Sequence, residues 1–357
     1  MTTAPAFDQA KAEAFAGSVL GTINGALVTL MISVAHRTGL FDRMSALSPS
    51  TSSEIADAAG LNERYVRECL GALTLAGIVE YDPAAKTYRL PAEHAAFLTR
   101  AAGPNNLSTF AQFVPLMASV EDKIIESFQQ GGGVPYSEFK TFHALMAEES
   151  AQVFDATLVD VTLPLTGIVD RLKDGIDVLD VGCGRGHAIN LMAKAFPNSR
   201  FVGYDFSDDA IAHARGEADS MGLANARFEV QDAAKFEAYE AFDLITAFDS
   251  IHDQAAPTAV LANIARALRP GSVFLMVDIA ASSNLEENAE HPLGAGLFAI
   301  STMHCMTVSL ALGGEGLGTV WGQQLAMKKL EEAGFTEVDI KSVEGDILNA
   351  YYIARKA

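Results

Sequence analysis

The sequence has few cysteines and few basic residues, and each shortage excludes a class of protein. Its 357 residues include three cysteines, Cys69, Cys183 and Cys305, which lie far apart in the chain. An odd number at such spacing does not suit a disulfide framework or a zinc site, so we expect reduced thiols, a cytoplasmic location and no metal. Lysine and arginine total 25 against 45 Asp and Glu, a net charge of -20. This charge argues against a partner held through its phosphates.

Long uninterrupted apolar runs are also missing. The most apolar early segment, "LGTINGALVTLMISVAHRTGLF" (residues 20–41), is interrupted by polar residues such as Asn24 and His36. We expect it to be a buried helix that is too short and too polar to span a bilayer, and therefore no membrane partner. Charged residues at positions 8, 11 and 13 replace the apolar core of a signal peptide, so we expect none.

The N-terminal part of the chain predicts a small helical domain. Residues 51–91, "TSSEIADAAGLNERYVRECLGALTLAGIVEYDPAAKTYRLP", contain two helical segments, a turn at Gly60 and a two-stranded ribbon around Asp82 and Pro83. This order is typical of a winged helix-turn-helix. DNA binding needs a basic face, but residues 1–100 carry eight basic and ten acidic side chains. We therefore expect residues 1–103 to form a module for homodimerisation and for capping a pocket, with no nucleic-acid partner.

The rest of the chain predicts a helical connector followed by an α/β domain. Residues 104–170 are helical, apart from the glycine-rich stretch "QQGGGVPYSEF", which we expect to form a lid-like loop. From residue 171 to 357 strand and helix patterns alternate, beginning with the strand "DVLDVG" and closing with the strand pair "TEVDIKSV" and "NAYYIARK". This alternation predicts a doubly wound, Rossmann-like parallel sheet.

Three glycines follow the first strand of this sheet, in "VLDVGCGRGHA". Gly182, Gly184 and Gly186 allow a tight turn at the carboxyl end of the strand, where such sheets bind ligands. A dinucleotide fingerprint requires glycine at position 187, which is a histidine here, and no Lys-Ser/Thr pair of a phosphate-binding loop follows. The turn therefore favours a ligand without a pyrophosphate.

Three acidic residues at strand ends fit a nucleoside with an amino acid portion. Asp180 precedes the turn and suits an ammonium group. Asp205 ends the next strand, where it suits the two ribose hydroxyls, and Asp232 follows the third strand, where it suits an adenine amine.

These motifs together resemble the class I S-adenosylmethionine-dependent methyltransferases. The likeness lies in "VLDVGCGRG", "GYDFS", "EVQDAAKF" and "FDLITAFDSIHD", in that order, and covers about residues 176–279. It implies a seven-stranded sheet, S-adenosylmethionine as cofactor and S-adenosylhomocysteine as product. It also implies that Phe206, Ala233 and Phe248 contact the cofactor, beside Asp205 on the ribose and Asp232 on the adenine.

The stretch "DSIHDQ" carries a second, narrower resemblance. It is similar to small-molecule O-methyltransferases with an N-terminal winged helix, in which a histidine of a His-Asp-Trp motif is the general base. Here His252 and Asp253 match the pair, but Gln254 stands where the family has tryptophan. The resemblance implies that His252, paired with Asp253, accepts a proton beside the cofactor's sulfur. The alternative role is a histidine that shapes the pocket.

An insertion after the fifth strand, residues 281–321, predicts the substrate cover. It is largely apolar and contains Met303, His304 and the single tryptophan, Trp321. Such a mixture suits a mainly apolar pocket with a few polar anchors. Tyr136 and His143, from the connector, are expected to reach the same pocket.

Two further interpretations remain open from the sequence. The segments "PYSEF", "HCMTVSL" and "GLGTVWG" resemble a bacterial group of winged-helix methyltransferases in which thiols and thioethers are acceptors. Methylation of a thioether requires no base, and His252 would then only position the acceptor. A protein of another class, a winged-helix regulator that senses S-adenosylmethionine, is the third interpretation. The expected partner in the first two is a small-molecule acceptor.

Overall fold

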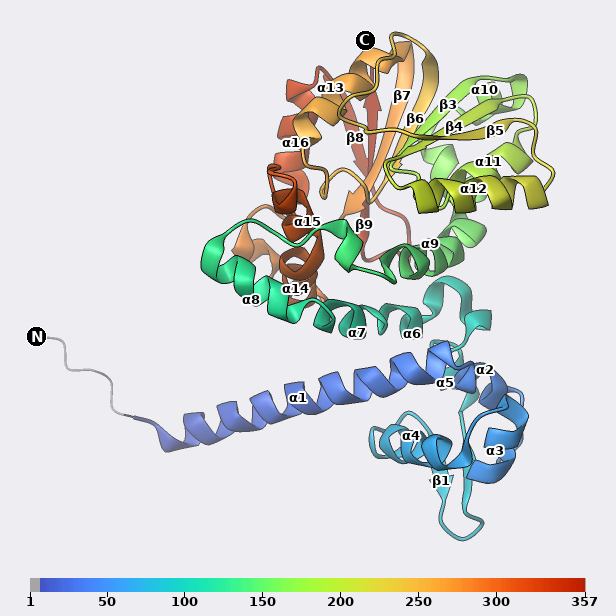
Figure 1. Ribbon diagram of the computed structural model, residues 1–357, viewed down its shortest axis with the longest axis vertical. Coiled ribbons are helices and arrows are strands. Elements are labelled where there is room, and N and C mark those ends of the chain that lie inside the picture. The colour runs from blue at the N-terminus through green and yellow to red at the C-terminus, as the bar shows by residue number, and fades with distance from the viewer. Residues whose placement is uncertain (1–6, 357) are drawn as a thin grey trace, which may run out of the picture. The chain divides into compact units, whose positions relative to one another are not determined.

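The computed structural model describes residues 7–356, which divide into two compact units, one ending at Leu116 and the other beginning at Met117 (Figure 1). The dividing point lies inside the segment 104–170 that we predicted as a separate connector. Most of that segment belongs to the second unit, because helix α9 (Phe142–Thr157) packs against helix α11 (His187–Ala195) of the α/β domain.

The first unit contains the predicted helix-turn-helix and wing. Its helices are α1 (Gln9–Arg37), α2 (Leu40–Ser45), α3 (Ser52–Ala59), α4 (Glu63–Leu75), α5 (Ala92–Ala95) and α6 (Leu107–Phe110). The wing is the antiparallel pair β1 (Glu80–Asp82) and β2 (Thr87–Arg89). Helix α3 begins at a capping box, in which the Thr51 hydroxyl accepts from the Glu54 amide and the Glu54 carboxylate accepts from the Thr51 amide. The core of this unit includes Phe41, Ile55, Leu70 and Leu73.

Helix α1 differs from the buried helix that we expected. It begins at Gln9, well before the apolar segment 20–41, and its buried residues, Ser33, Ala35 and His36, all lie near its C-terminal end. Leu20 is 68% and Leu27 is 60% exposed. By length and composition alone, α1 and the continuous helical stretch Gly294–Ala311 of the second unit are each long and apolar enough to cross a membrane. Core helices of proteins in water satisfy the same criterion.

The second unit is built on the predicted seven-stranded sheet, with strand order β5-β4-β3-β6-β7-β9-β8. Its strands are β3 (Asp177–Val181), β4 (Arg200–Asp205), β5 (Ala226–Val230), β6 (Phe242–Phe248), β7 (Leu268–Ile279), β8 (Glu337–Lys341) and β9 (Asn349–Arg355). The first five are parallel to one another, whereas β9 runs antiparallel to both β7 and β8. This architecture confirms the predicted fold class.

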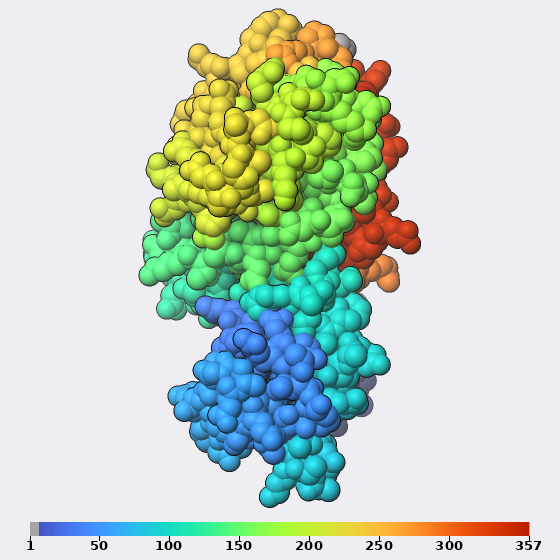
Figure 2. All heavy atoms as spheres, turned by 90° about the vertical axis from the view of Figure 1, so that its right-hand side faces the viewer, coloured from blue at the N-terminus to red at the C-terminus, as the bar shows by residue number. Residues whose placement is uncertain are grey.

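Helices cover both faces of the sheet, as alternation along its strands requires. On β3, Leu179 and Val181 face one core with helices α13 (Pro257–Ala267) and α16 (Gly322–Glu332). Val178 faces the other core, with α10 (Val169–Asp174), α11 and α12 (Asp208–Ser220). The two helical layers are visible on either side of the sheet (Figure 1). In the space-filling view, side chains of residues 150–250, green to yellow, cover one face of this unit (Figure 2).

Further helices belong to the second unit, except that the first of those given next spans the boundary between the two units. They are α7 (Phe113–Ala118), α8 (Glu121–Gln130), the short η2 (Tyr136–Glu138), and the stretch formed by α14 (Gly294–Ile300), η6 (Ser301–Cys305) and α15 (Met306–Ala311). The η6 segment is a π-helical turn between two α-helices. Turns of this kind are frequent at functional sites.

Candidate active site

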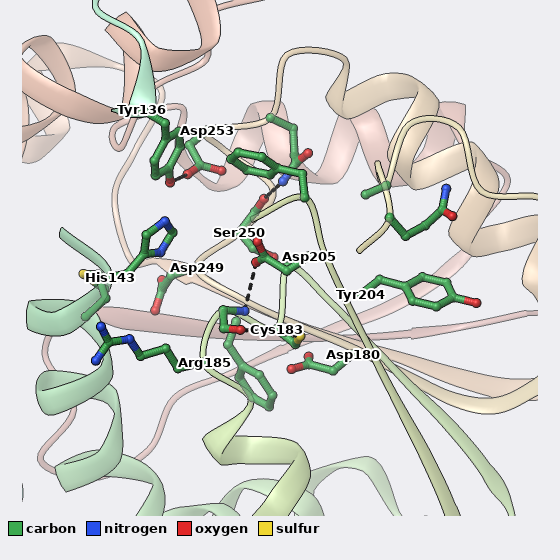
Figure 3. Close-up of a pocket in the computed structure, with 18 of the residues that line it drawn as sticks. Tyr136, His143, Asp180, Cys183, Arg185, Tyr204, Asp205, Asp249, Ser250 and Asp253 are labelled. Atoms are coloured by element: carbon green, nitrogen blue, oxygen red, sulfur yellow. Dashed lines mark hydrogen bonds between the residues drawn. The ribbon is translucent and has the colours of Figure 1, made fainter. Parts of the chain in front are cut away.

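A cavity of about 510 Å³ opens at the carboxyl ends of β3, β4 and β6 (Figure 3). It lies where doubly wound sheets bind their ligands. Twelve of the residues predicted from the sequence line it: Tyr136, His143, Asp180, Gly182, Gly184, Gly186, Asp205, Phe206, Asp232, Ala233, Phe248 and Asp253. Residues more than a hundred positions apart in the chain therefore meet at one site.

The glycine turn has the backbone conformation that its spacing predicts. Gly182, Gly184 and Gly186 have φ of 73°, 53° and 79°. A Cβ on Gly182 would stand 2.5 Å from Cβ of Ser250, and one on Gly186 would stand 2.5 Å from the ring of Phe228. Two of the three glycines are thus required by close packing as well as by the left-handed backbone.

Asp205 joins the turn to the end of β4. One carboxylate oxygen accepts from the backbone N–H of Gly184 at 2.9 Å, and the other accepts from the backbone N–H of Ser207, also at 2.9 Å. Burial raises the pKa of this carboxyl, and the backbone hydrogen bonds oppose that rise. The side chain therefore holds the turn in place as well as facing the cavity (Figure 3).

The other two predicted cofactor carboxylates lie in contrasting surroundings. Asp180 is buried and accepts from the Thr246 hydroxyl at 2.7 Å. Burial raises its pKa to about 7. Asp232 is more exposed and pairs with Lys235 at 2.8 Å, and this hydrogen bond lowers its pKa.

His252 is not at the cavity wall, although the sequence placed it beside the cofactor's sulfur. It is 4% exposed, and its Nδ1 lies 2.8 Å from the Asp278 carboxylate. Burial lowers the pKa of His252, but Asp278 and the Cys305 thiol outweigh burial and hold it well above its ordinary value. The side chain turns inward because Asp278, at the end of β7, is a stronger partner than the open cavity.

Asp253, the next residue, does face the cavity. Its carboxylate accepts a hydrogen bond of 2.5 Å from the phenol of Tyr136, and the two side chains point toward one another (Figure 3). Burial raises the pKa of Asp253 to about 6, although the neighbouring His252 lowers it. The carboxyl is therefore mostly ionised at pH 7, and its pKa lies close enough to that pH for it to accept a proton during a reaction.

The predicted residues of the cover lie behind the cavity wall. Met303, His304 and Trp321 are absent from the lining residues that the structure describes. The Trp321 indole is buried in the core and donates to Asp278 at 3.1 Å, so its polar atom already has a partner in the fold. This corrects the expectation that Trp321 faces an acceptor. Met303 and His304 lie on the π-helical turn η6.

The sequence analysis overlooked Asp249, which follows β6 and lines the cavity. Its φ is +50°, a conformation that a non-glycine residue rarely adopts, and its Oδ1 is buried without a hydrogen-bond partner among the described residues. Its carboxyl has a strongly raised pKa because of burial and of the charge of Asp278. Its position directly after an apolar strand was the available signal, but roles at this strand end were assigned only to Phe248, His252 and Asp253.

The donor set of this cavity fits S-adenosylmethionine. Asp180, Asp205, Asp249 and Asp253 all line it, and such carboxylates suit a ligand that carries an ammonium group and a sulfonium. Asp205 lies beside the glycine turn, where it can also accept from ribose hydroxyls.

Comparison with known proteins agrees with this fit. Residues 26–100 match a family described as the Rv2258c-like winged HTH domain, and residues 172–334 match a methyltransferase domain. The nocamycin O-methyltransferase of Saccharothrix syringae is 30% identical over 208 residues, which cover 54% of this chain and 72% of that protein. The fatty-acid O-methyltransferase of Mycolicibacterium smegmatis is 31% identical over 105 residues, 29% of this chain and 38% of that protein.

A solved structure extends the likeness to nearly the whole fold. Human N-acetylserotonin methyltransferase, in complex with S-adenosylmethionine, superimposes with a TM-score of 0.65 at 18% identity, covering 99% of this chain and 100% of that one. The chain belongs to the S-adenosylmethionine-dependent methyltransferases with an N-terminal winged helix-turn-helix domain. It is therefore an enzyme of that class, with S-adenosylmethionine as its cofactor.

Proposed function

We propose that this enzyme transfers a methyl group to a hydroxyl oxygen of a small molecule. The observation that carries the proposal is Asp253, a carboxylate with a pKa of about 6 that lines the cavity and already accepts a hydroxyl hydrogen bond. A hydroxyl must lose its proton when its oxygen is methylated, and a positioned carboxylate is able to accept it. The 30% identity to an O-methyltransferase supports the same atom.

The cofactor contacts follow from the lining of the cavity. S-adenosylmethionine, when bound, supplies a methyl group on a positively charged sulfur. We propose that Asp205 holds the ribose and Asp180 the amino acid end, against the turn formed by Gly182, Gly184 and Gly186. Phe206, Asp232, Ala233 and Phe248, which line the same cavity, are proposed to hold the remaining parts. Alignment of acceptor, methyl and sulfur supplies much of the rate in such a displacement.

We propose that the pair of His252 and Asp253 accepts the proton, with Asp253 in contact with the molecule that is methylated. His252 is paired with Asp278, which raises its pKa, and its charged form favours the ionised form of Asp253. The competing assignment makes His252 itself the general base. That assignment requires its imidazole to be neutral and to reach the cavity.

The acceptor is proposed to bind at the part of the cavity that Tyr136 and His143 line, where their rings stack with centroids 5.8 Å apart. Met303 and His304, one layer behind, are proposed to reach the acceptor if the segment carrying Tyr136 moves.

The test is formation of S-adenosylhomocysteine from phenols, aliphatic alcohols, thiols and thioethers over a pH series. It compares the wild type with Asp253→Asn, His252→Ala and, as a control, Asp219→Asn, which alters an exposed carboxylate on α12. We expect turnover on a hydroxyl acceptor to fall by about 10²–10⁴-fold in Asp253→Asn. The control is expected to match the wild type. Turnover confined to thioethers, flat with pH and equal in the wild type and Asp253→Asn, would overturn the proposal.

We further propose that the protein is a cytoplasmic homodimer assembled through its N-terminal unit. The three cysteines are all free, which suits a reducing compartment. Exposed apolar side chains on α1, among them Phe15, Leu20 and Leu27, support a contact with a second copy.

A further inference from the structure

The side chain of Tyr136 lines the cavity and is enclosed by other aromatic rings. Its ring is surrounded by four others, those of Phe142, His143, Phe206 and His304, with centroid distances between 5.1 and 5.8 Å. Three of these contacts are edge-on and the one with His143 is stacked, which are the arrangements that aromatic rings prefer. We call this set of four rings the aromatic cage.

The hydroxyl of Tyr136 ends on the carboxylate that we propose as proton acceptor. The 2.5 Å hydrogen bond to Asp253 is of the charge-assisted kind, which is short and strong. Tyr136 thus shows that the cavity accommodates a phenol with its ring in the aromatic cage and its hydroxyl on Asp253.

One histidine of the cage, His304, lacks the partners that a purely structural role would give it. His304 is fully buried, and neither of its ring nitrogens has a hydrogen-bond partner in residues 7–356. Its ring stacks on Phe142 with centroids 3.8 Å apart, and burial lowers its pKa to about 3, so it is neutral. Leaving a buried polar atom unpaired is costly, which indicates that His304 pairs with a group brought in by a ligand.

The segment that carries Tyr136 begins with three consecutive glycines. Gly131 and Gly132 have φ of 75° and 80°, a region in which glycine is unstrained. Few other residues allow the backbone to change direction so readily. Directly after these glycines the chain is anchored, because the buried backbone N–H of Val134 donates to the Thr307 hydroxyl at 2.8 Å, so a displacement of Tyr136 has to begin beyond Val134.

We propose that Tyr136 is an internal occupant of the acceptor site, and that the acceptor is a phenol whose hydroxyl replaces that of Tyr136 on Asp253. The ring of the acceptor enters the aromatic cage, and a polar substituent on it pairs with His304. This inference rests on the proposed function, since it assumes transfer to oxygen. In the transfer, a bond forms between the phenol oxygen and the methyl carbon while the carbon–sulfur bond of the sulfonium breaks. The sulfur keeps the electron pair, and the phenol proton passes to Asp253.

The test uses p-cresol, which has the structure of the tyrosine side chain, and the variant Tyr136→Ala. Binding of p-cresol to the enzyme saturated with S-adenosylhomocysteine is measured by calorimetry, and 4-methylanisole is measured by mass spectrometry after incubation with S-adenosylmethionine. We expect Tyr136→Ala to bind p-cresol at least tenfold more tightly than the wild type and to convert it to 4-methylanisole. Toluene, which has no hydroxyl for Asp253, is expected to bind about tenfold more weakly than p-cresol.

A second variant keeps the test valid if Tyr136→Ala does not fold. Tyr136→Phe retains the ring but loses the hydrogen bond to Asp253, so p-cresol should displace it more easily and bind about tenfold more tightly than to the wild type. The matched control is Tyr351→Phe, which removes a similar bond, 2.6 Å to Asp346, between two residues that do not line the cavity. That control is expected to bind p-cresol as the wild type does.

The possible results separate this inference from the proposed function. If Tyr136→Ala binds p-cresol without methylating it, while still methylating another hydroxyl acceptor, the cage is not the acceptor site. Affinities for p-cresol equal to the wild type in both Tyr136 variants would also overturn the inference. If neither the wild type nor any variant methylates a hydroxyl, the proposed function fails, and this inference fails with it.

Discussion

At the scale of single residues, Asp205 has two roles, and loss of either is expected to weaken cofactor binding. It faces the cavity, and it accepts from the backbone N–H groups of Gly184 and Ser207. We expect Asp205→Ala to weaken binding of S-adenosylmethionine by about 10–100-fold, because hydrogen bonds to a charged group contribute about 1.5–3 kcal/mol. Isothermal calorimetry measures this directly, with Asp219→Asn as the control. An unchanged dissociation constant would mean that the ribose lies elsewhere.

The pKa of Asp253 leads to a prediction for the pH dependence of the reaction. Burial raises its pKa to about 6, so the carboxylate form that accepts a proton is populated above that pH. The groups that face it are Tyr136, whose phenol donates to it, and the titratable side chains of His252, Asp278 and Asp205.

We therefore expect kcat/KM for a hydroxyl acceptor to rise tenfold per pH unit below about pH 6 and to level off above it. Asp253→Asn should remove this rise together with most of the activity. A profile whose rise is kept in Asp253→Asn but lost in His252→Ala would assign the proton to His252.

At the scale of elements, two glycines of the turn after β3 differ in how closely other atoms pack around them. Both Gly184 and Gly186 have positive φ. An added Cβ on Gly186 meets the Phe228 ring and the Ala214 methyl, whereas around Gly184 no described atom lies within 4 Å of an added Cβ.

Gly186→Ala should therefore lower the free energy of unfolding more than Gly184→Ala does. Left-handed backbone alone costs an alanine about 1–2 kcal/mol, and forced overlap in a packed core adds about 1–3 kcal/mol. Thermal denaturation of the two variants side by side measures the difference. Equal melting temperatures would show that the contacts of Gly186 relax without cost.

The elements of the second unit were predicted well, because each carries its own periodicity. The strands β3 and β6 are runs of apolar residues, and the helices between them have one apolar face, so both can be identified locally. Helix α1 was predicted less well. Its apolar segment resembles a core helix, but most of its length has no partner in the fold of a single chain, and burial is not a local property.

At the scale of the whole molecule, the exposed part of α1 predicts an assembly. If a second copy covers it, replacing Leu20 and Leu27 by glutamate puts charges into that contact and should convert a dimer into a monomer. Light scattering after size-exclusion chromatography measures the mass of each. The control Lys11→Glu changes charge at a residue that already pairs with solvent-exposed Asp8. A wild type that is monomeric, or that binds neutral lipid vesicles through α1, would contradict the proposed dimer.

The sequence by itself determined the fold class, the turn and the cofactor. Glycine spacing, strand-end carboxylates and alternating periodicity are local features, and the structure assembles them at one edge of the sheet as expected. Only the tertiary structure decided the roles within the pair His252 and Asp253. Two adjacent residues after a strand point in different directions, and their partners, Asp278 and Tyr136, come from segments 26 and 117 positions away. The direction of a side chain depends on those distant partners, and no local pattern encodes them.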